Sequence, residues 1–413
     1  MTETRSMTET YVIVGGGQAG AVAAASLRTF GFGGRILFVG AESHLPYERP
    51  PLSKEVLTKP ETARLTIHPD SFYADNAIET RFGTAAVTLD AEAHTLELAN
   101  GETVRYDRLL LATGARARPY PLLDHLGSGV HTVRTLDDSE ALRGHIWPGR
   151  RVLVVGGGVI GLEVAASVVS MGGTVTVIER GDRLMARAAP APLADDLRAL
   201  HEGHGVGFAF GCELVEAVKA KDGTITLAAA DGRRFTGDLV VYGVGVELNV
   251  ELAVSAGLHV EDGIVVDEHG RTSHPDIFAA GDVARQWHPH LNGYRRFETW
   301  ANAQNQGACV ARAMVTGEAC GFEVPWYWTD QYGINIQVAG SCEADDWLLR
   351  GDRDGGRYTL FGITGGVVTG AVTVNNGRDM RPARALIAAG AAADAARLTD
   401  ARTPLRAPAA KAA

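Results

Sequence analysis

The sequence contains few cysteines, and none of them has the spacing of a redox or metal-binding pair. The 413 residues include four cysteines, with no Cys-x-x-Cys element and no zinc or iron–sulfur pattern. They are Cys212, Cys309, Cys320 and Cys342. The segment 40–60 contains none of them. We therefore predict no metal site and expect four reduced, mostly buried thiols.

Long apolar runs and an excess of positive charge are also missing. No run reaches the length needed to span a bilayer, and the first ten residues carry Glu3 and Glu9 in place of the apolar core of a signal peptide. Lys and Arg number 39 against 49 Asp and Glu, so the net charge is −10. Nucleic-acid binding needs clustered cations. We therefore expect a cytoplasmic protein that binds neither membrane nor nucleic acid.

Glycine, in contrast, is abundant, and two groups of glycines share one spacing. Among the 50 glycines are Gly15-x-Gly17-x-x-Gly20 and Gly156-x-Gly158-x-x-Gly161. Each group follows an apolar strand-like run and opens a helical stretch. The first glycine allows a tight turn, the second lets backbone N–H groups approach a pyrophosphate, and the third lets the helix pack closely. Two complete fingerprints predict two dinucleotide-binding halves on separate sheets.

An acidic residue follows each fingerprint after the next predicted strand. These residues are Glu42 and Glu179. Such an acid accepts hydrogen bonds from ribose hydroxyls and repels a 2′-phosphate, so Glu179 favours NAD(H) over NADP(H), although Arg180 and Arg183 could accommodate a phosphate. Hydride transfer needs a donor and an acceptor in one crevice. We therefore predict a tightly held FAD on the first half and an exchanging NAD(H) on the second.

The pattern of elements predicts an α/β fold with two Rossmann-like domains and a small C-terminal α+β domain. Aromatic residues cluster after Pro325, and alternating hydrophobicity at 358–374 indicates a hairpin. We expect the Ala-rich tail after Gly390 to fray. The predicted segments are 1–114 and 246–324 for the FAD-binding domain, 115–245 for the NAD-binding domain, and 325–413 for the C-terminal domain.

Five segments together resemble a known family. They are YERPPLSK, VGGGVIGLEVAA, ETWANAQNQG, PWYWTDQ and VNNGRD. From Tyr11 to about Leu405 the chain resembles the NADH-dependent ferredoxin reductase components of aromatic-ring dioxygenase systems of the biphenyl type, and it is similar to putidaredoxin and rhodocoxin reductases. The resemblance implies an enzyme that passes a hydride from NADH to FAD. Single electrons would then go to a [2Fe–2S] ferredoxin that feeds a terminal oxygenase.

The resemblance also implies the residues of the site. Lys54 would lie near the reactive edge of the flavin, Glu163 would hold the nicotinamide, and Trp300 would cover the ring; these three are the expected catalytic residues. We expect Lys54 and Glu163 to lie close enough for a salt bridge. The implied FAD contacts are Gly15, Gly17, Ala19, Gly20, Glu42, Arg49, Lys54, Ala86, Ala112, Gly114, Arg134, Asp282 and Trp300. The implied NAD contacts are Gly156, Gly158, Ile160, Gly161, Glu163, Glu179, Arg187 and Gly245.

One position departs from the family pattern. Many relatives carry an acid directly after the glycine that ends the second strand, where this chain has Ala41. The ribose contact expected of Glu42 therefore differs in detail from that of these relatives.

The cysteine pattern distinguishes this chain from other enzymes of similar architecture. Disulfide reductases carry a redox cysteine pair, and their peroxidase and oxidase relatives carry a cysteine beside the flavin, but neither sulfur is in place here. Two alternatives stay open: an NADH oxidase that delivers electrons to O₂, and an NADH-gated flavoprotein interaction module. The ferredoxin of a cytochrome P450 system is an alternative acceptor, and a homodimer is also open.

A ferredoxin partner would need a local basic surface on this acidic chain. Arg295 and Arg296 precede Trp300. We predict that neutralising both slows ferredoxin reduction more at low salt than at high salt. The C-terminal segment is also basic and contains Arg381, Arg384, Arg397, Arg402, Arg406 and Lys411.

Overall fold

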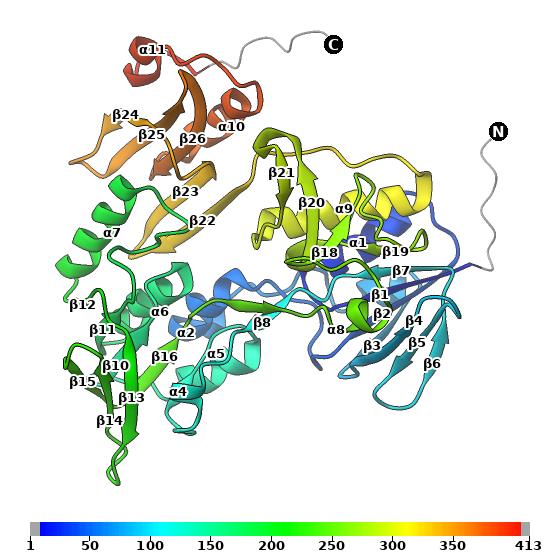
Figure 1. The fold of residues 1–413 in the computed structure, drawn as a ribbon, viewed down its shortest axis with the longest axis horizontal. Coiled ribbons are helices and arrows are strands. Elements are labelled where there is room, and N and C mark those ends of the chain that lie inside the picture. The colour runs from blue at the N-terminus through cyan, green and yellow to red at the C-terminus, as the bar shows by residue number, and fades with distance from the viewer. Residues whose placement is uncertain (1–8, 406–413) are drawn as a thin grey trace. The chain divides into compact units, whose positions relative to one another are not determined.

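The computed structural model describes residues 9–405, which divide into two compact units (Figure 1). Unit 1 comprises the chain up to Glu48 together with Arg64–Arg116 and Glu247–Pro325. Unit 2 comprises Arg49–Ala63, Ala117–Val246 and the chain from Trp326 onward. The chain passes between the units at five points, and two of them lie within short strands, β8 (Ala115–Ala117) and β17 (Val246–Leu248). The domain boundaries set out from the sequence stay predictions.

Unit 1 is built on a five-stranded parallel sheet in the order β19-β7-β1-β2-β3. The apolar runs that predicted strands are buried in it. The strands are β1 (Thr10–Val14), β2 (Arg35–Gly40), β3 (Ile78–Phe82), β7 (Arg108–Leu111) and β19 (Ile277–Ala279). Two helices, α1 (Gln18–Thr29) and α9 (Trp300–Thr316), pack on one face, where Leu27 and Met314 share a core with Ile13.

The other face of this sheet is covered by short elements. Leu89 and Leu96 pack there against Val12 and Leu37. The covering elements are β4 (Ala86–Asp90), β5 (Thr95–Leu98), β6 (Thr103–Arg105) and α8 (Glu251–Ser255). The remaining elements of unit 1 are α3 (Phe72–Asp75), β18 (Ile264–Val266), β20 (Ala284–His288) and β21 (Gly293–Arg295).

Unit 2 repeats the architecture with a second parallel sheet, in the order β12-β11-β10-β16-β9. Its strands are β9 (Val130–His131), β10 (Arg151–Val155), β11 (Thr174–Ile178), β12 (Gly207–Ala209) and β16 (Leu239–Tyr242). The helices α5 (Leu136–Arg143) and α6 (Val159–Ser170) cover one face. The other face carries α4 (Pro121–Asp124) and the antiparallel strands β13 (Leu214–Lys219), β14 (Ile225–Ala229) and β15 (Arg234–Gly237).

The segment 49–63 belongs to unit 2, although the sequence placed it with the first FAD-binding segment. It forms a 3₁₀ turn at Pro50–Ser53 and α2 (Glu55–Thr58). Leu57 is fully buried in one core cluster with Leu142 of α5 and Val164 of α6. Burial of this side chain fixes the segment beside α6.

The C-terminal segment forms a five-stranded antiparallel sheet in the order β22-β23-β26-β25-β24. The strands are β22 (Trp326–Gln331), β23 (Ile334–Gly340), β24 (Asp346–Asp352), β25 (Arg357–Thr364) and β26 (Val367–Val374). One face packs on α7 (Ala191–Gly203), and the other packs on α10 (Met380–Ala388) and α11 (Ala395–Thr399) (Figure 1). The predicted fold class, two Rossmann-like domains with a small C-terminal domain, is confirmed.

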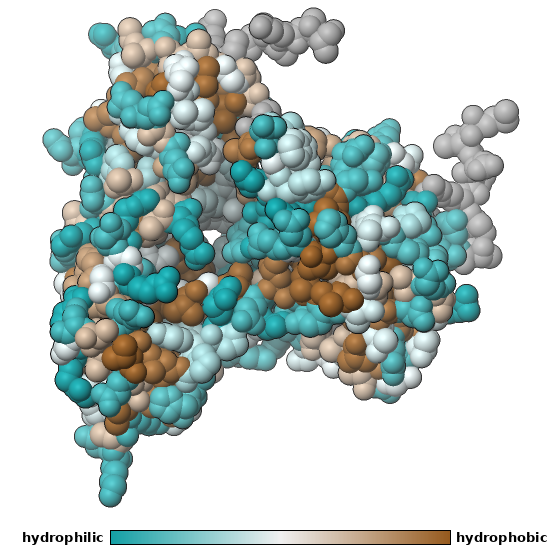
Figure 2. Space-filling model, viewed as in Figure 1, coloured by the Kyte–Doolittle hydropathy of each residue, from teal (hydrophilic) through white to brown (hydrophobic). Residues whose placement is uncertain are grey.

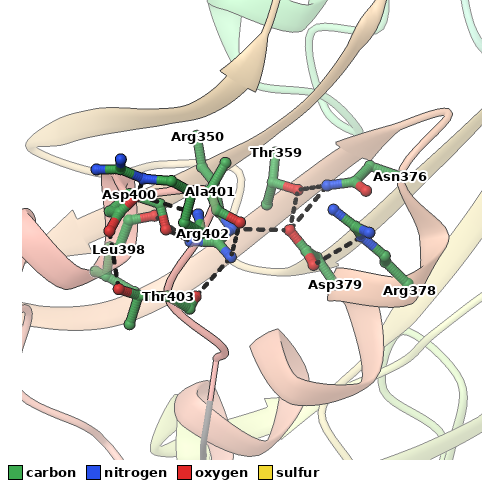
Figure 3. A network of polar contacts seen from close by, with 10 residues as sticks. All are labelled: Arg350, Thr359, Asn376, Arg378, Asp379, Leu398, Asp400, Ala401, Arg402 and Thr403. Atoms are coloured by element: carbon green, nitrogen blue, oxygen red, sulfur yellow. Dashed lines mark hydrogen bonds and ion pairs between the residues drawn. The ribbon is translucent and has the colours of Figure 1, made fainter.

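The chain beyond Gly390 is held in place up to Thr403, so the expected fraying is wrong there. The buried guanidinium of Arg350 donates hydrogen bonds to the backbone oxygens of Leu398, Asp400, Ala401 and Thr403 and pairs with Asp379 at 3.1 Å (Figure 3). These bonds use all three guanidinium nitrogens. A cavity of about 250 Å³ adjoins this network. Arg350 is the most deeply buried cation in its lining, and its guanidinium is already engaged by protein acceptors.

The expectation of four reduced thiols is also wrong. Cys309 in α9 and Cys320 are joined as a disulfide, with Cα atoms 5.4 Å apart, whereas Cys212 and Cys342 are free. Gly317 ends α9 in the left-handed conformation (φ 79°), which reverses the chain and returns Cys320 alongside the helix. Two cysteines eleven residues apart have no local sequence signature that would reveal this reversal.

The face seen in Figure 2 is mostly hydrophilic, with hydrophobic residues gathered in limited patches. The exposed apolar side chains of unit 2 include Val215 and Val218, which project from β13. Within residues 9–405, no helix is long and apolar enough to cross a membrane.

Candidate functional site

In unit 1, the turn between β1 and α1 leaves the helix N-terminus open. Gly15 has φ +121°, and a Cβ there would overlap the backbone oxygen of Ala112; a Cβ on Gly20 would overlap the oxygen of Gly15. Gly17 is the N-cap of α1, no side chain within residues 9–405 caps it, and nothing lies within 4 Å of the place of its missing Cβ. Uncapped N–H groups at a helix N-terminus bind anions.

Unit 2 repeats this geometry between β10 and α6. Gly156 has φ +108°, a Cβ on it would lie 2.5 Å from the oxygen of Gly243, and a Cβ on Gly161 would overlap the oxygen of Gly156. Gly158 is an open N-cap without a capping side chain from the described residues. Ile160 in the first turn of the helix is 44% exposed, which leaves an apolar surface beside the open N-terminus.

The acid at the end of β11 is bound to the glycine turn. Glu179 Oε2 accepts the N–H of Gly157 at 2.7 Å, and Oε1 accepts the N–H of Gly181 at 2.6 Å. Arg183 donates to the backbone oxygens of Ala186 and Ala189, both at 2.8 Å. Its guanidinium is therefore engaged by the backbone, which leaves Arg180 as the exposed cation next to this acid.

The acid of unit 1 is held differently. Glu42 accepts a hydrogen bond from the hydroxyl of Tyr47. The backbone oxygen of Glu42 accepts a hydrogen bond from the N–H of Gly83 at 2.8 Å. The backbone oxygen of Gly40 accepts one from the N–H of Thr84 at 3.1 Å. Ala86 follows these residues at the start of β4, so two of the expected contacts lie near the end of β2.

The ends of β7 and β19 bring further predicted residues to the first glycine turn. Ala112 follows β7 and lies against Gly15, and Gly114 has φ +61°. A Cβ on Gly281, which precedes Asp282, would lie 3.0 Å from the Cβ of Ala19 in α1. The structure therefore places Ala19, Ala112 and Asp282 around one turn.

Trp300 is the first residue of α9, whose N-cap Thr299 accepts the N–H of Asn302 at 3.1 Å. The indole Nε1 donates a hydrogen bond to the carboxylate of Glu48. Burial raises the pKa of Glu48, and the bond from Trp300 partly opposes this rise. The bond fixes the orientation of the indole ring in unit 1.

In unit 2, Lys54 and Glu163 form a buried ion pair, as predicted. Lys54 Nζ lies 3.4 Å from Glu163 Oε1 and 3.8 Å from Asp330 Oδ2. Glu163 is 3% exposed and also accepts hydrogen bonds from the hydroxyls of Ser53 and Thr329. Burial raises the pKa of Glu163, while the Lys54 charge and these bonds lower it.

The remaining predicted residues of unit 2 lie in two places. Arg49 donates a hydrogen bond to the backbone oxygen of Arg134, which precedes the capping box of α5. Arg187 is exposed, and its guanidinium lies 3.9 Å from the place where Gly245 would carry a Cβ. Gly245 has φ +115°, so a side chain there would be strained.

Sequence reasoning missed the groups behind the ion pair. Thr329 and Gln331 are buried on β22, and His201 is buried on α7. Thr329 and Gln331 have the i, i+2 spacing that places two strand residues on one face, which is the one signal that could have indicated them. His201 carries no such signal.

Part of the predicted basic surface is already neutralised within unit 1. Arg296 pairs with Glu298 and with Asp262, the latter at 3.4 Å, and its side chain is 15% exposed. Arg295 remains exposed. In the C-terminal segment Arg384 lies over the ring of Trp326, and Arg402 pairs with Asp400. Arg406 and Lys411 lie outside the described residues.

Two clusters in the described part of the chain bring together potential metal ligands. The first is His94, His274 and Asp276, and the second is Asp267, Glu268 and His269. His274 Nδ1 accepts the backbone N–H of Asp276 at 3.3 Å. In the neutral ring this bond places the proton on Nε2, the nitrogen that would otherwise be free to bind a metal.

Comparisons with known proteins agree with this geometry. Residues 9–307 match the family described as pyridine nucleotide-disulphide oxidoreductase, and residues 326–409 match the reductase C-terminal family. A 3-phenylpropionate/cinnamic acid dioxygenase ferredoxin–NAD(+) reductase component from Photorhabdus laumondii is 45% identical over 92% of this chain and 96% of its own.

Solved structures are similar over nearly the full length. The ferredoxin reductase for the CYP199A2 system from Rhodopseudomonas palustris is 35% identical, with a TM-score of 0.91 over 96% of this chain and 99% of its own. Putidaredoxin reductase, in its covalent complex with putidaredoxin, is 33% identical, with a TM-score of 0.87 over 92% of this chain and 93% of the other.

Proposed function

The chain belongs to the pyridine nucleotide-disulphide oxidoreductase family, and from this premise we propose that it is an FAD-dependent ferredoxin–NAD(+) reductase of a ring-hydroxylating dioxygenase system. The observation that carries the proposal is the pair of open helix N-termini, at Gly17 and at Gly158, each behind its own glycine turn. Two such anion sites suit two dinucleotides.

The first turn fits the pyrophosphate of FAD. Its donor set is the uncapped N–H groups of α1, and the open space at Gly17 admits a phosphate where a side chain would block it. Asp282 is suited to a sugar hydroxyl, and the indole of Trp300, oriented by Glu48, is suited to cover a flat ring. Bound FAD supplies the capacity to accept an electron pair and release single electrons.

The second turn is assigned to NADH. The N–H groups of α6 would bind its pyrophosphate, with the exposed Ile160 beside it. Each carboxylate oxygen of Glu179 accepts one backbone N–H and keeps capacity for a ribose hydroxyl. A 2′-phosphate would meet this negative charge, so NADH is the preferred donor.

Lys54 and Glu163 position the nicotinamide. Glu163 lies on α6, on the same helix whose N-terminus would bind the pyrophosphate, and its carboxylate can accept hydrogen bonds from the carboxamide. Lys54 balances the buried charge of Glu163, which would otherwise be costly. These residues would orient the reactive edge of the nicotinamide, and the hydride transfer requires no protein acid or base.

The disulfide of unit 1 is not placed for disulfide reduction. Cys309 follows Trp300 by nine positions on α9, which corresponds to about 14 Å along the helix axis. The segment 49–63, which contains Lys54, has no cysteine. We therefore do not assign thiol chemistry to this site. The proposed electron acceptor is a [2Fe–2S] ferredoxin in the cytoplasm, which would feed a ring-hydroxylating oxygenase.

The test uses the purified yellow protein with NADH and cytochrome c. We expect cytochrome c reduction to depend on an added [2Fe–2S] ferredoxin, with dioxygenase-type ferredoxins compared against P450-type ferredoxins in parallel. A rate that is the same without ferredoxin, or NADH consumption matched by O₂ uptake, would contradict the proposal and favour an oxidase. Slow reduction with an NADH-dependent change in oligomeric state would contradict it in favour of an interaction module.

A further inference from the structure

Four hydrogen bonds, three of them buried, run in series through unit 2 and end at Glu163 of the ion pair. Tyr332 OH lies 3.0 Å from His201 Nδ1, and His201 Nε2 lies 2.7 Å from Gln331 Oε1. Gln331 Nε2 donates to Thr329 Oγ1 at 3.0 Å, and Thr329 Oγ1 donates to Glu163 Oε1 at 2.6 Å. These four residues, which we call the donor chain, connect α7 through β22 to α6 (Figure 1).

The direction of every bond follows from the carboxylate. An ionised Glu163 can only accept hydrogen bonds, so Thr329 must donate its single hydroxyl hydrogen to it. The Thr329 oxygen must then accept a hydrogen bond from the Gln331 amide. The amide oxygen then faces His201, so Nε2 of the ring carries the proton and Nδ1 accepts the hydroxyl hydrogen of Tyr332. All four hydrogens therefore point toward Glu163.

The surroundings favour this single arrangement. His201, Gln331 and Thr329 are each at most 1% exposed. Burial lowers the pKa of His201, which favours the neutral ring. The nearby titratable and charged groups are His204, which stacks on Tyr332 with ring centroids 3.8 Å apart, and Lys54 and Asp330 at the other end. Phe208 packs edge-on against His201 and adds no charge.

We propose that the donor chain is a positioning device that keeps Glu163 ionised and oriented toward Lys54. Hydrogen bonds aligned in one direction polarise one another, and in a buried site they stabilise the anion at their end more than a single donor does. The proposal deepens the proposed function, on which it rests for the role of the Lys54–Glu163 pair. It assigns Thr329, Gln331, His201 and Tyr332 as residues that act through Glu163.

The donor chain also allows Glu163 two discrete states, ionised and protonated. When Glu163 takes up a proton, its hydroxyl can donate to Thr329. The remaining hydrogen bonds can then reverse only if the Gln331 amide turns over, because its nitrogen donates hydrogen bonds and cannot accept them. Ionised Glu163 suits a carboxamide donor and the Lys54 ammonium, whereas protonated Glu163 does not balance the Lys54 charge. The donor chain thereby sets the pH below which Glu163 loses the negative charge that balances Lys54.

The direct test is the titration of Glu163 by infrared difference spectroscopy on the FAD-loaded protein, without NADH or ferredoxin, with Glu163→Gln identifying the carboxyl band. We expect Thr329→Val to move the protonation midpoint upward by about one pH unit, the equivalent of one charged hydrogen bond. Thr329→Ser restores the hydroxyl and should restore the midpoint.

A matched control is Thr373→Val. Thr373 is 1% exposed on β26, and its hydroxyl has no hydrogen-bond partner among the described residues. We expect no shift from this change. A midpoint in Thr329→Val that equals the wild-type value, or a shift of equal size in Thr373→Val, would overturn the proposal.

The distant end of the chain is tested by a double-mutant cycle. We expect His201→Phe alone to raise the protonation midpoint by less than Thr329→Val does. In the Thr329→Val background it should add nothing, because the hydrogen bonds between His201 and Glu163 are already interrupted. Additive shifts would overturn action through the chain. This titration involves no turnover, so its result does not depend on ferredoxin reduction. Failure to reduce ferredoxin would refute the proposed function, whereas the shift of the Glu163 midpoint would still test the donor chain.

Discussion

The clearest test of the nucleotide assignment is Glu179→Ala. The carboxylate offers about four lone-pair sites, of which two accept the N–H groups of Gly157 and Gly181, so two remain for the ribose diol. A hydrogen bond to a charged group contributes about 1.5–3 kcal/mol. At about 1.4 kcal/mol per tenfold, the NADH/NADPH ratio of kcat/KM should fall about 10- to 150-fold.

The ratio is the informative quantity because it is independent of how much of the variant is folded. The Ala substitution also removes the acceptor of two backbone N–H groups, and any resulting loss of active protein affects both nucleotides equally. Glu216→Ala, on the exposed face of β13 with its side chain 54% exposed, is the matched control and should leave the ratio unchanged. A ratio in Glu179→Ala within twofold of the parent would refute the reasoning.

Three further predictions follow from particular contacts. A Cβ on Gly161 would overlap Gly156 and one on Gly20 would overlap Gly15, so Gly161→Ala should keep the yellow colour but lose NADH binding by titration. Gly20→Ala should purify colourless, because it should not retain FAD. The control is Gly203→Ala, where nothing lies within 4 Å of the added Cβ, and it should behave as wild type. The assignment of the two turns fails if Gly20→Ala and Gly161→Ala both bind FAD and NADH. Arg350→Met removes the buried cation beside Asp379, which keeps the more distant Arg378 at 3.8 Å, and should cost at most about 3–5 kcal/mol in denaturant unfolding. Arg402→Met, at 94% side-chain exposure, should cost little, and equal effects of the two substitutions would contradict the structural role of Arg350. Burial lowers the pKa of His201 from its usual 6.5, so the unfolded state takes up the proton first, and stability is lost as the pH falls below that value. The fall in Tm from about pH 7.5 to about pH 5.5 should then be smaller in His201→Gln than in wild type, and identical falls would exclude this contribution.

The two β-turn-α units proposed to bind the nucleotides were predictable from the sequence because their determinants are local. An apolar run, a glycine with φ above zero and a glycine that touches the preceding turn are encoded within about ten residues, and the structure has β1 and α1, and β10 and α6, where this pattern placed them. The Lys54–Glu163 pair was expected from the family resemblance and not from spacing.

Three of the features that the sequence did not predict depend on contacts between distant segments, and the fourth, the disulfide, depends on a reversal of the chain. Leu57 carries the segment 49–63 into unit 2 because it is buried against α5 and α6. Arg350 holds a tail whose Ala-rich composition indicated fraying. The disulfide at Cys309 depends on the reversal at Gly317, and the donor chain depends on α7 packing against the C-terminal sheet.

The most direct test of the central claim is an anaerobic count of electrons. The FAD-loaded protein is mixed with limiting NADH and excess oxidised [2Fe–2S] ferredoxin, and reduced ferredoxin is followed by its visible spectrum. We expect two ferredoxins to be reduced for each NADH consumed, because one hydride carries two electrons and each cluster accepts one. NADH oxidation that leaves the ferredoxin oxidised, or that proceeds only when O₂ is admitted, would contradict it.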